Sequence, residues 1–127
     1  PINPRKQWPN RGLKHSNNHG KIAKSYQANY GKVASFLGDA GLGDLVNVGK
    51  NQQQYFSDEL IDACVVMFKE WDPQPSPTWV TCVPSLRNPT LVPDFAKRLA
   101  QALNLSFRVA IEKTDSRPAQ NKFNNSY

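Results

Sequence analysis

The sequence predicts an α/β fold in which a helical N-terminal part is followed by a βαβ unit. Two short apolar segments rich in β-branched residues, 79–83 and 106–111, enclose a segment, 91–103, whose apolar residues recur at helical spacing. The first two patterns are typical of strands, and the third is typical of a helix that buries one face. Because one helix connects the two strands, we expect them to lie parallel with a right-handed crossover.

Length and composition limit the chain to one domain, or to one small domain with an extension. No segment approaches the roughly 20 apolar residues that cross a membrane, and residues 1–5 are not followed by the apolar stretch of a signal peptide. We therefore expect a cytoplasmic protein without a membrane partner. Because the chain begins without Met, we also expect an excised fragment. Cys64 and Cys82 are interpreted as small, reduced hydrophobic residues, with a disulfide between them as the alternative.

The positive charge is concentrated near the N-terminus. Residues 1–38 contain seven basic residues and no acidic one, whereas residues 39–127 contain nine basic and ten acidic residues, so the net charge of +6 is the sum of +7 and −1. Lys and Arg displace counterions from phosphates, and aromatic side chains can stack on bases. The charge fits a nucleic-acid-binding arm and a solvated linker equally well. Candidate nucleic-acid-binding residues are Arg5, Lys6, Trp8, Arg11, Lys14, Lys21 and Lys24.

Three regions follow one another: a basic arm at 1–20, a helical segment at 21–76, and the βαβ unit with a polar tail at 77–127. The arm has no hydrophobic period, so we expect it to be extended or disordered. In the helical segment, helical character is expected most clearly over 27–37.

The Gly-rich stretch at 38–44 is interpreted as a helix C-cap and turn, because a phosphate-binding Gly loop follows a strand. Asp44 is a candidate cap for a short helix that ends at Val48, and 50–55 is expected to be a polar connection.

The clearest long helix is expected to begin at Ser57, a good N-cap residue, and to continue to Trp71. Asp58 and Glu59 favour the positive end of the helix dipole. The apolar stripe is interpreted as a core face, and the Pro-rich stretch 72–78 ends the helix.

Known catalytic motifs are missing from the sequence. It contains no P-loop, no zinc-protease H-E-x-x-H and no G-x-S-x-G nucleophile elbow. His15 and His19 have H-x-x-x-H spacing but no partner ligands, so we assign neither a metal site nor catalytic residues. The residues alone support a small α/β domain with a basic arm.

A family resemblance covers most of the chain. Residues 78–105, TWVTCVPSLRNPTLVPDFAKRLAQALNL, with 112–127, EKTDSRPAQNKFNNSY, resemble the first half of a type I phosphoribosyltransferase domain. They are most similar to the ComF-like version found on the C-terminal side of some bacterial RecQ-type ATP-dependent DNA helicases. PRKQWP at 4–9, GDAGLG at 38–43 and FSDELIDA at 56–63 agree with that subgroup.

The resemblance implies a phosphate site in two parts. The loop after the first strand would contact pyrophosphate, and a flexible segment after the second strand would add polar and basic groups. A turn that carries a hydroxyl and a guanidinium suits that ligand. The phosphate-binding residues implied are Pro84, Ser85, Leu86, Arg87, Thr114, Arg117 and Gln120.

One departure from the family limits the activity expected. The apolar strand, acidic pair and Thr/Gly-rich loop that grip the ribose phosphate are missing, as is the helicase motor with its P-loop. The fragment by itself is therefore expected to bind no cofactor and to catalyse nothing. The resemblance assigns ATP and magnesium to the parent helicase, and a complete domain could bind phosphoribosyl diphosphate.

Three functions follow as hypotheses. The first is an accessory C-terminal module of a RecQ-type helicase in DNA repair or recombination, whose partners are DNA and the motor of the same parent chain. The second is the front half of a phosphoribosyltransferase. The third is a protein-docking domain, because a two-stranded sheet leaves edges that need cover.

Overall fold

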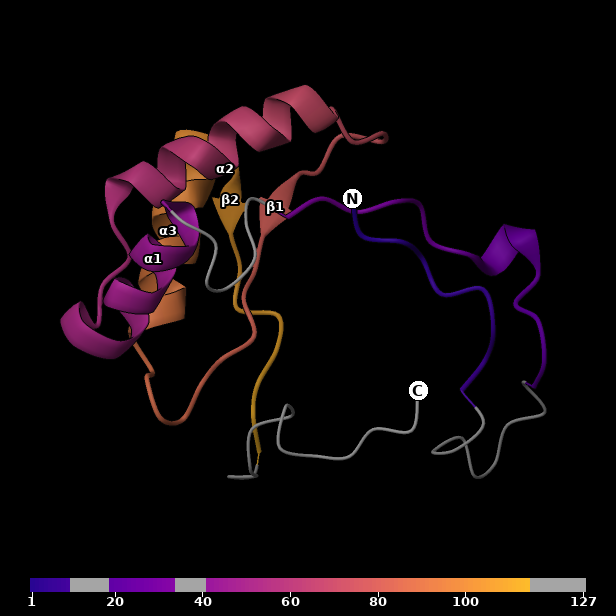
Figure 1. The fold of residues 1–127 in the computed structure, drawn as a ribbon, viewed down its shortest axis with the longest axis horizontal. Coiled ribbons are helices and arrows are strands. Elements are labelled where there is room, and N and C mark those ends of the chain that lie inside the picture. The colour runs from indigo at the N-terminus through magenta and orange to yellow at the C-terminus, as the bar shows by residue number, and fades with distance from the viewer. Residues whose placement is uncertain (10–18, 34–40, 115–127) are drawn as a thin grey trace. The chain divides into compact units, whose positions relative to one another are not determined.

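The computed structural model describes residues 1–9, 19–33 and 41–114 (Figure 1). They belong to two compact units, an N-terminal unit that contains Pro1–Lys32 and a C-terminal unit that contains the described part of Val33–Ser116. In chain order the elements are the 3₁₀ turn η1 (Lys24–Tyr26), α1 (Leu42–Val48), the π-helical turn η2 (Gly49–Gln53), α2 (Asp58–Trp71), β1 (Trp79–Val80), α3 (Leu91–Ala102) and β2 (Ser106–Phe107).

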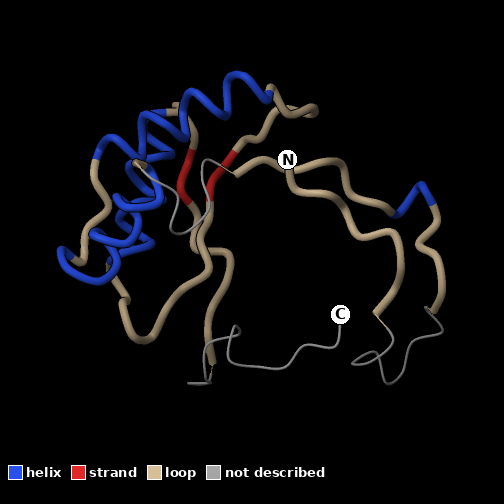
Figure 2. The backbone as a smooth tube through the Cα atoms, in the orientation of Figure 1, coloured by secondary structure: helices blue, strands red, loops and turns tan. Residues whose placement is uncertain are grey.

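The C-terminal unit combines helices with a small parallel sheet. β1 pairs with β2 in parallel, with Trp79 opposite Ser106 and Val80 opposite Phe107. The predicted pair of parallel strands joined by a helix is thus confirmed, and the unit is of mixed α/β character (Figure 2).

Both strands are shorter than the sequence predicts. Past the ladder, the Arg108 N–H still donates to the Val80 carbonyl at 2.8 Å, but the Ala110 N–H donates to the side-chain Oγ1 of Thr81 at 3.4 Å. A side-chain acceptor has replaced a backbone one, so the regular ladder ends there, and Pro84 has no N–H to restart it.

The core lies between α3, α2 and the strands. α3 packs against α2 and against both strands. It buries Leu91, Ala96 and Ala100, the last with only 1 % of its surface exposed, while α2 buries Leu60 and Ile61. Ala96 and Ala100 are four residues apart and share a helix face, so their small side chains let neighbouring elements approach closely.

The two long helices begin and end as the sequence predicts. α2 starts directly after Ser57, which has extended N-cap geometry, and it ends at Trp71, where the N–H of the C-cap Asp72 donates to the Phe68 carbonyl at 3.0 Å. The expected cap hydrogen bond is missing, however. The Ser57 hydroxyl is buried and has no partner among the described residues. The helix start is therefore favoured by Asp58 and Glu59 in its first turn.

The short helices depart from the prediction. α1 begins at Leu42 with Gly41 at the N-cap, so Asp44 lies in the first turn and is not the cap. The segment expected to be a polar connection instead continues the helix as η2. Gly49 makes this possible, because a Cβ there would lie 2.7 Å from Phe56 Cδ1 and 2.7 Å from the Tyr55 carbonyl oxygen.

Helix was also predicted over 27–37, and this prediction is wrong for the part of it that the structure describes. Residues 27–33 are not helical, and the adjacent η1 is a single 3₁₀ turn. The reason is long-range pairing: Gly31 exchanges two backbone hydrogen bonds with Ile2, at 2.8 and 3.0 Å. Residues 34–37 lie outside the described residues.

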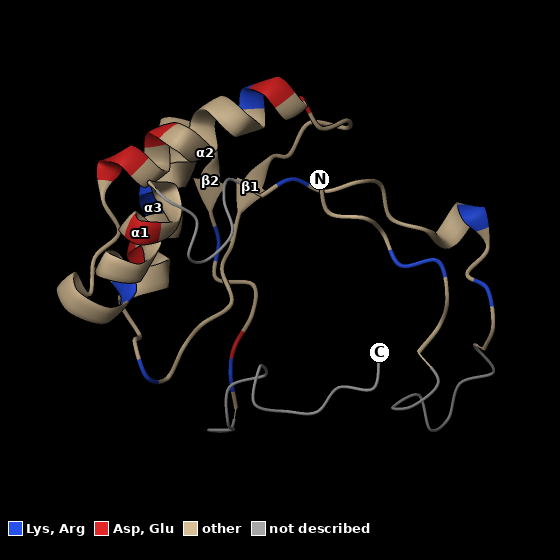
Figure 3. Cartoon of the chain, viewed as in Figure 1, with Lys and Arg blue, Asp and Glu red and all other residues tan. Residues whose placement is uncertain are grey.

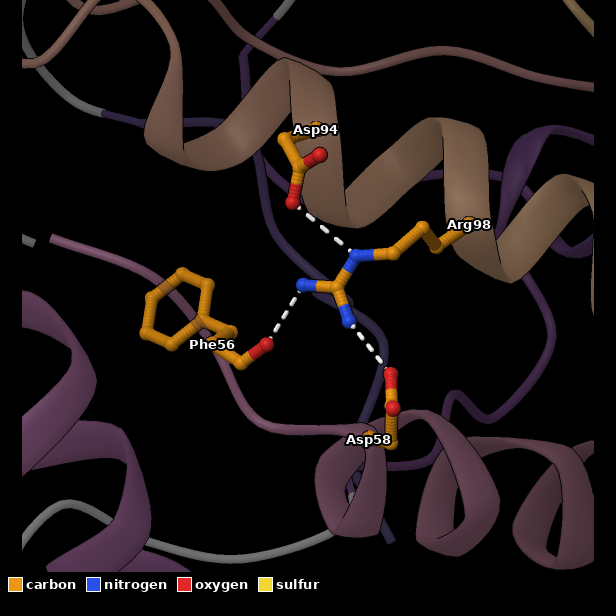
Figure 4. Close-up of polar contacts among 4 residues, drawn as sticks. All are labelled: Phe56, Asp58, Asp94 and Arg98. Carbon is orange, nitrogen blue, oxygen red and sulfur yellow. Dashed lines mark hydrogen bonds and ion pairs between the residues drawn. The ribbon is translucent and has the colours of Figure 1, made fainter. Parts of the chain in front are cut away.

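The guanidinium of Arg98 links α3 to the start of α2 through hydrogen bonds (Figure 4). It donates to Asp94 Oδ2 on its own helix at 2.9 Å, to Asp58 Oδ1 at 2.8 Å and to the Phe56 backbone carbonyl. The same group lies over the Tyr55 ring, 4.2 Å from its centre. Its side chain is only 20 % exposed, so water replaces these partners poorly.

We expect the Arg98→Met substitution to lower the free energy of unfolding by about 2 kcal/mol, because the Phe56 carbonyl loses a charged donor. Urea denaturation measures the change. Asp58→Asn is the matched control: the Asp58 side chain is 83 % exposed, and we expect its loss to cost less than about 1 kcal/mol. Equal effects of the two substitutions would contradict this role for Arg98.

Candidate functional site

The described part of the basic arm forms an antiparallel ribbon with the segment that follows it. Gln7 bridges Lys21, flanked by hydrogen bonds from the Trp8 N–H to the Gly20 carbonyl and from the Ile22 N–H to the Lys6 carbonyl, both at 2.9 Å. The Ile2 and Gly31 pair closes the other end. Residues 1–9 are thus extended, as the sequence predicts, but they are paired with a second segment.

Pairing sorts the ribbon side chains onto two faces. Residues two apart in an extended segment, and residues directly opposite, share a face. Lys6 and Trp8 therefore lie on the face of Ile22, which is 8 % exposed, and Arg5 lies on the opposite face with Gln7 and Lys21. The half-buried Trp8 belongs to the apolar face of the ribbon.

Basic residues occur along both segments of the ribbon, and no acidic residue accompanies them (Figure 3). All basic residues of its described part are exposed, and no acidic residue occurs in residues 1–38. Tyr26 and Tyr30 are 79 % and 58 % exposed, so their rings can be reached by a ligand. The exposed basic residues are Arg5, Lys6, Lys21, Lys24 and Lys32, whereas the candidates Arg11 and Lys14 lie outside the described residues.

The loop expected to bind phosphate connects the carboxyl end of β1 to the start of α3. Its shape is fixed by Ser85, whose Oγ accepts the Asn88 N–H at 3.3 Å. Pro84 and Ser85 are half-buried, while Leu86 and Arg87 are exposed. The Arg87 side chain is therefore accessible to a ligand, whereas Ser85 also has a structural role.

Thr114 is exposed and is the last described residue of the segment that follows β2. Because the strands are parallel, Thr114 and the loop after β1 both follow carboxyl ends of strands, which meet at one edge of a sheet. Both segments thus leave the sheet at the same edge, although Thr114 comes seven residues after the end of β2 at Phe107. Arg117 and Gln120, the remaining candidates, lie outside the described residues.

No group of three or more His, Cys, Asp or Glu side chains that could hold a metal ion occurs among the described residues. No helix in the described part of the chain is long and apolar enough to span a membrane.

The two cysteine thiols are free and half-buried. Burial raises the pKa of the Cys64 thiol above its usual range, because the thiolate loses solvation. Cys64 is thus disfavoured as a nucleophile, since the thiolate is the reactive form.

Comparison with models of protein families, with curated proteins and with solved structures finds no match to this chain.

Two features of the site were missed by the sequence analysis. The first is the pairing of the arm with residues 19–31. Because the arm has no hydrophobic period, its sequence gave no signal of this pairing. The second is the contact between Arg108 and Trp79, where the guanidinium carbon lies 5.8 Å from the ring centre. That contact depends on strand register, although the alternation along 106–111 could have placed Arg108 on one face with Ser106.

The raised pKa of the Cys64 thiol predicts that its reactivity and the stability of the protein depend on pH. In the Cys82→Ser variant, we expect Cys64 to react with iodoacetamide at pH 8 more slowly in the folded protein than in urea. We also expect the free energy of unfolding to fall as pH rises through the ordinary thiol pKa of about 8.5, because the unfolded state then releases a proton that the folded state keeps.

Alkylation rates and urea denaturation between pH 7 and 10 check both expectations, with pH steps chosen on either side of about 8.5. Cys64→Ala in the same background removes the thiol and serves as the control. An identical pH dependence of stability with and without Cys64 would contradict the shift.

Proposed function

We propose that this chain is a DNA-binding accessory module that contacts the phosphate backbone through its N-terminal ribbon and is not catalytic by itself. The observation that carries the proposal is an exposed ribbon with basic residues on both segments, accompanied by accessible tyrosines and free of acidic residues. Lys and Arg on such a surface release counterions from DNA, and exposed rings can stack on bases.

The resemblance described above gives this module a biological setting. We propose that it is the C-terminal accessory region of a RecQ-type helicase acting in DNA repair or recombination. The motor of the parent chain would supply ATP hydrolysis with magnesium, and the ribbon would hold DNA near that motor. Positioning by phosphate contacts needs no base recognition, which suits an enzyme that acts on many sequences.

Substitution of Arg5→Ala with Lys21→Ala, two exposed residues on one face of the ribbon, tests the ribbon. We expect weaker binding to labelled single-stranded and forked DNA, and a slope of log affinity against log salt that is smaller by about 1.4 to 1.8 for two lost phosphate contacts. Fluorescence anisotropy at roughly 50 and 200 mM salt measures both.

The matched control is Lys50→Ala with Lys69→Ala, which removes two exposed lysines from the C-terminal unit and should leave binding unchanged. Wild-type protein that does not bind DNA at the lower salt concentration, or equal losses in both double variants, would overturn the proposal.

A second candidate function is favoured by the position of the loop after β1. We propose that the βαβ unit is phosphoribosyltransferase-like, and that Ser85, Arg87 and Thr114 belong to a diphosphate site at the carboxyl edge of the sheet. Support comes from the parallel pairing and from the exposed guanidinium of Arg87, which suits a phosphate.

Isothermal calorimetry with inorganic pyrophosphate tests this site. We expect Arg87→Ala to weaken binding about tenfold through loss of one charged hydrogen bond. Lys50→Ala, which removes an exposed charge on η2, is the control and should bind like the wild type. Absence of binding heat from the wild-type chain would count against a diphosphate site within these residues.

A further inference from the structure

The two faces of the parallel sheet differ in what covers them. Val80 and Phe107 are opposite each other and share a face. That face is directed toward α3, because Lys97 Nζ of α3 lies 5.7 Å from the centre of the Phe107 ring. The neighbouring pair, Trp79 and Ser106, therefore belongs to the opposite face of the sheet.

Trp79 and Arg108 form an accessible pair on this second face. Arg108 is two residues after Ser106 and so lies on the same side, with its guanidinium carbon 5.8 Å from the centre of the Trp79 ring. Trp79 remains 40 % exposed, and Arg108 is exposed. A large ring is thus held in place by the strand with a guanidinium over it, and part of its surface remains open to a ligand.

The charge around this pair favours an anionic ligand. In the described part of the C-terminal unit, most acidic residues lie on the helices or directly after α2 (Figure 3). The strands and the segments that follow them carry three basic residues, Arg87, Arg108 and Lys113, against the single acidic Glu112. A polymer with negative charges and flat aromatic groups matches both the charge and the ring.

We propose that Trp79 and Arg108 form a stacking site for single-stranded nucleic acid, in which a base stacks on the indole and Arg108 contacts the adjacent phosphate. A base stacked on an aromatic side chain next to a guanidinium is a general mode of single-strand recognition that tolerates any sequence. The inference deepens the proposed DNA binding and rests on it for the class of ligand, but it uses residues outside the ribbon.

The first test is affinity for a labelled oligothymidylate of about 12 nucleotides. We expect Trp79→Ala to weaken binding about 5- to 100-fold, as loss of one stacked base does, and Trp79→Phe to stay close to wild type because a ring remains. Arg108→Ala should weaken binding and also reduce the salt slope by about 0.7 for one lost phosphate contact on a single strand. The matched control is Trp71→Ala at the end of α2, where the tryptophan is 37 % exposed, and it should change nothing.

The second test leaves Trp79 intact. In the variant Trp8→Phe with Trp71→Phe, Trp79 is the remaining tryptophan, since the sequence has three. We expect oligothymidylate to quench its fluorescence, and inorganic polyphosphate or polyglutamate, which carry charge without bases, to leave it unchanged. Equal quenching by either charged polymer would overturn base stacking, as would wild-type affinity in both Trp79 variants.

Failure of this inference can be told apart from failure of the ribbon proposal. If Arg5→Ala with Lys21→Ala weakens binding while Trp79→Ala does not, the ribbon binds DNA and the stacking site falls. If only Trp79→Ala weakens binding, the stacking site stands without the ribbon. If the wild type binds forked DNA but no oligothymidylate, only the stacking site falls, and if it binds neither, both are overturned.

Discussion

The C-terminal unit depends on one guanidinium group. Arg98 joins its own helix to a segment that precedes it by about 40 residues, the turn around Tyr55 and the start of α2 that follows it. Its planar fork of donors can satisfy several acceptors at once, which a lysine ammonium at the same place could not do with the same geometry. α3 in turn carries the sheet on its apolar face, so the position of β1 and β2 relative to α2 is set through this contact.

Local signals made the two long helices predictable. The boundaries of α2 follow from its acidic first turn and the prolines after it, and α3 follows from the helical spacing of its apolar residues. The parallel strands follow from the order of elements. Long-range pairing defeated the prediction at Gly31, where two hydrogen bonds to Ile2 override a helical pattern. The prediction also failed at η2, for a different reason. Gly49 has no side chain and so fits against Phe56 and the Tyr55 carbonyl, which lets the helix continue despite its polar composition.

The candidate sites were predictable to different degrees. Charge is a property of composition, so the basic arm could be found from the sequence alone. Which side chains share a face could not, because register in the ribbon and in the sheet depends on hydrogen bonds between distant residues. Ser85 illustrates the difference: its type suggested a ligand, whereas its hydroxyl also accepts the Asn88 N–H that shapes the loop.

The close approach around Gly49 also predicts how the sequence can vary. A side chain as small as a methyl group would collide with Phe56 and with the Tyr55 carbonyl, while residues 50–54 are exposed. In a library of random substitutions under selection for folded protein, position 49 should therefore retain glycine while residues 50–54 diverge. Gly49, directly before a polar stretch that composition marks as unconstrained, is thus a residue that is hard to replace.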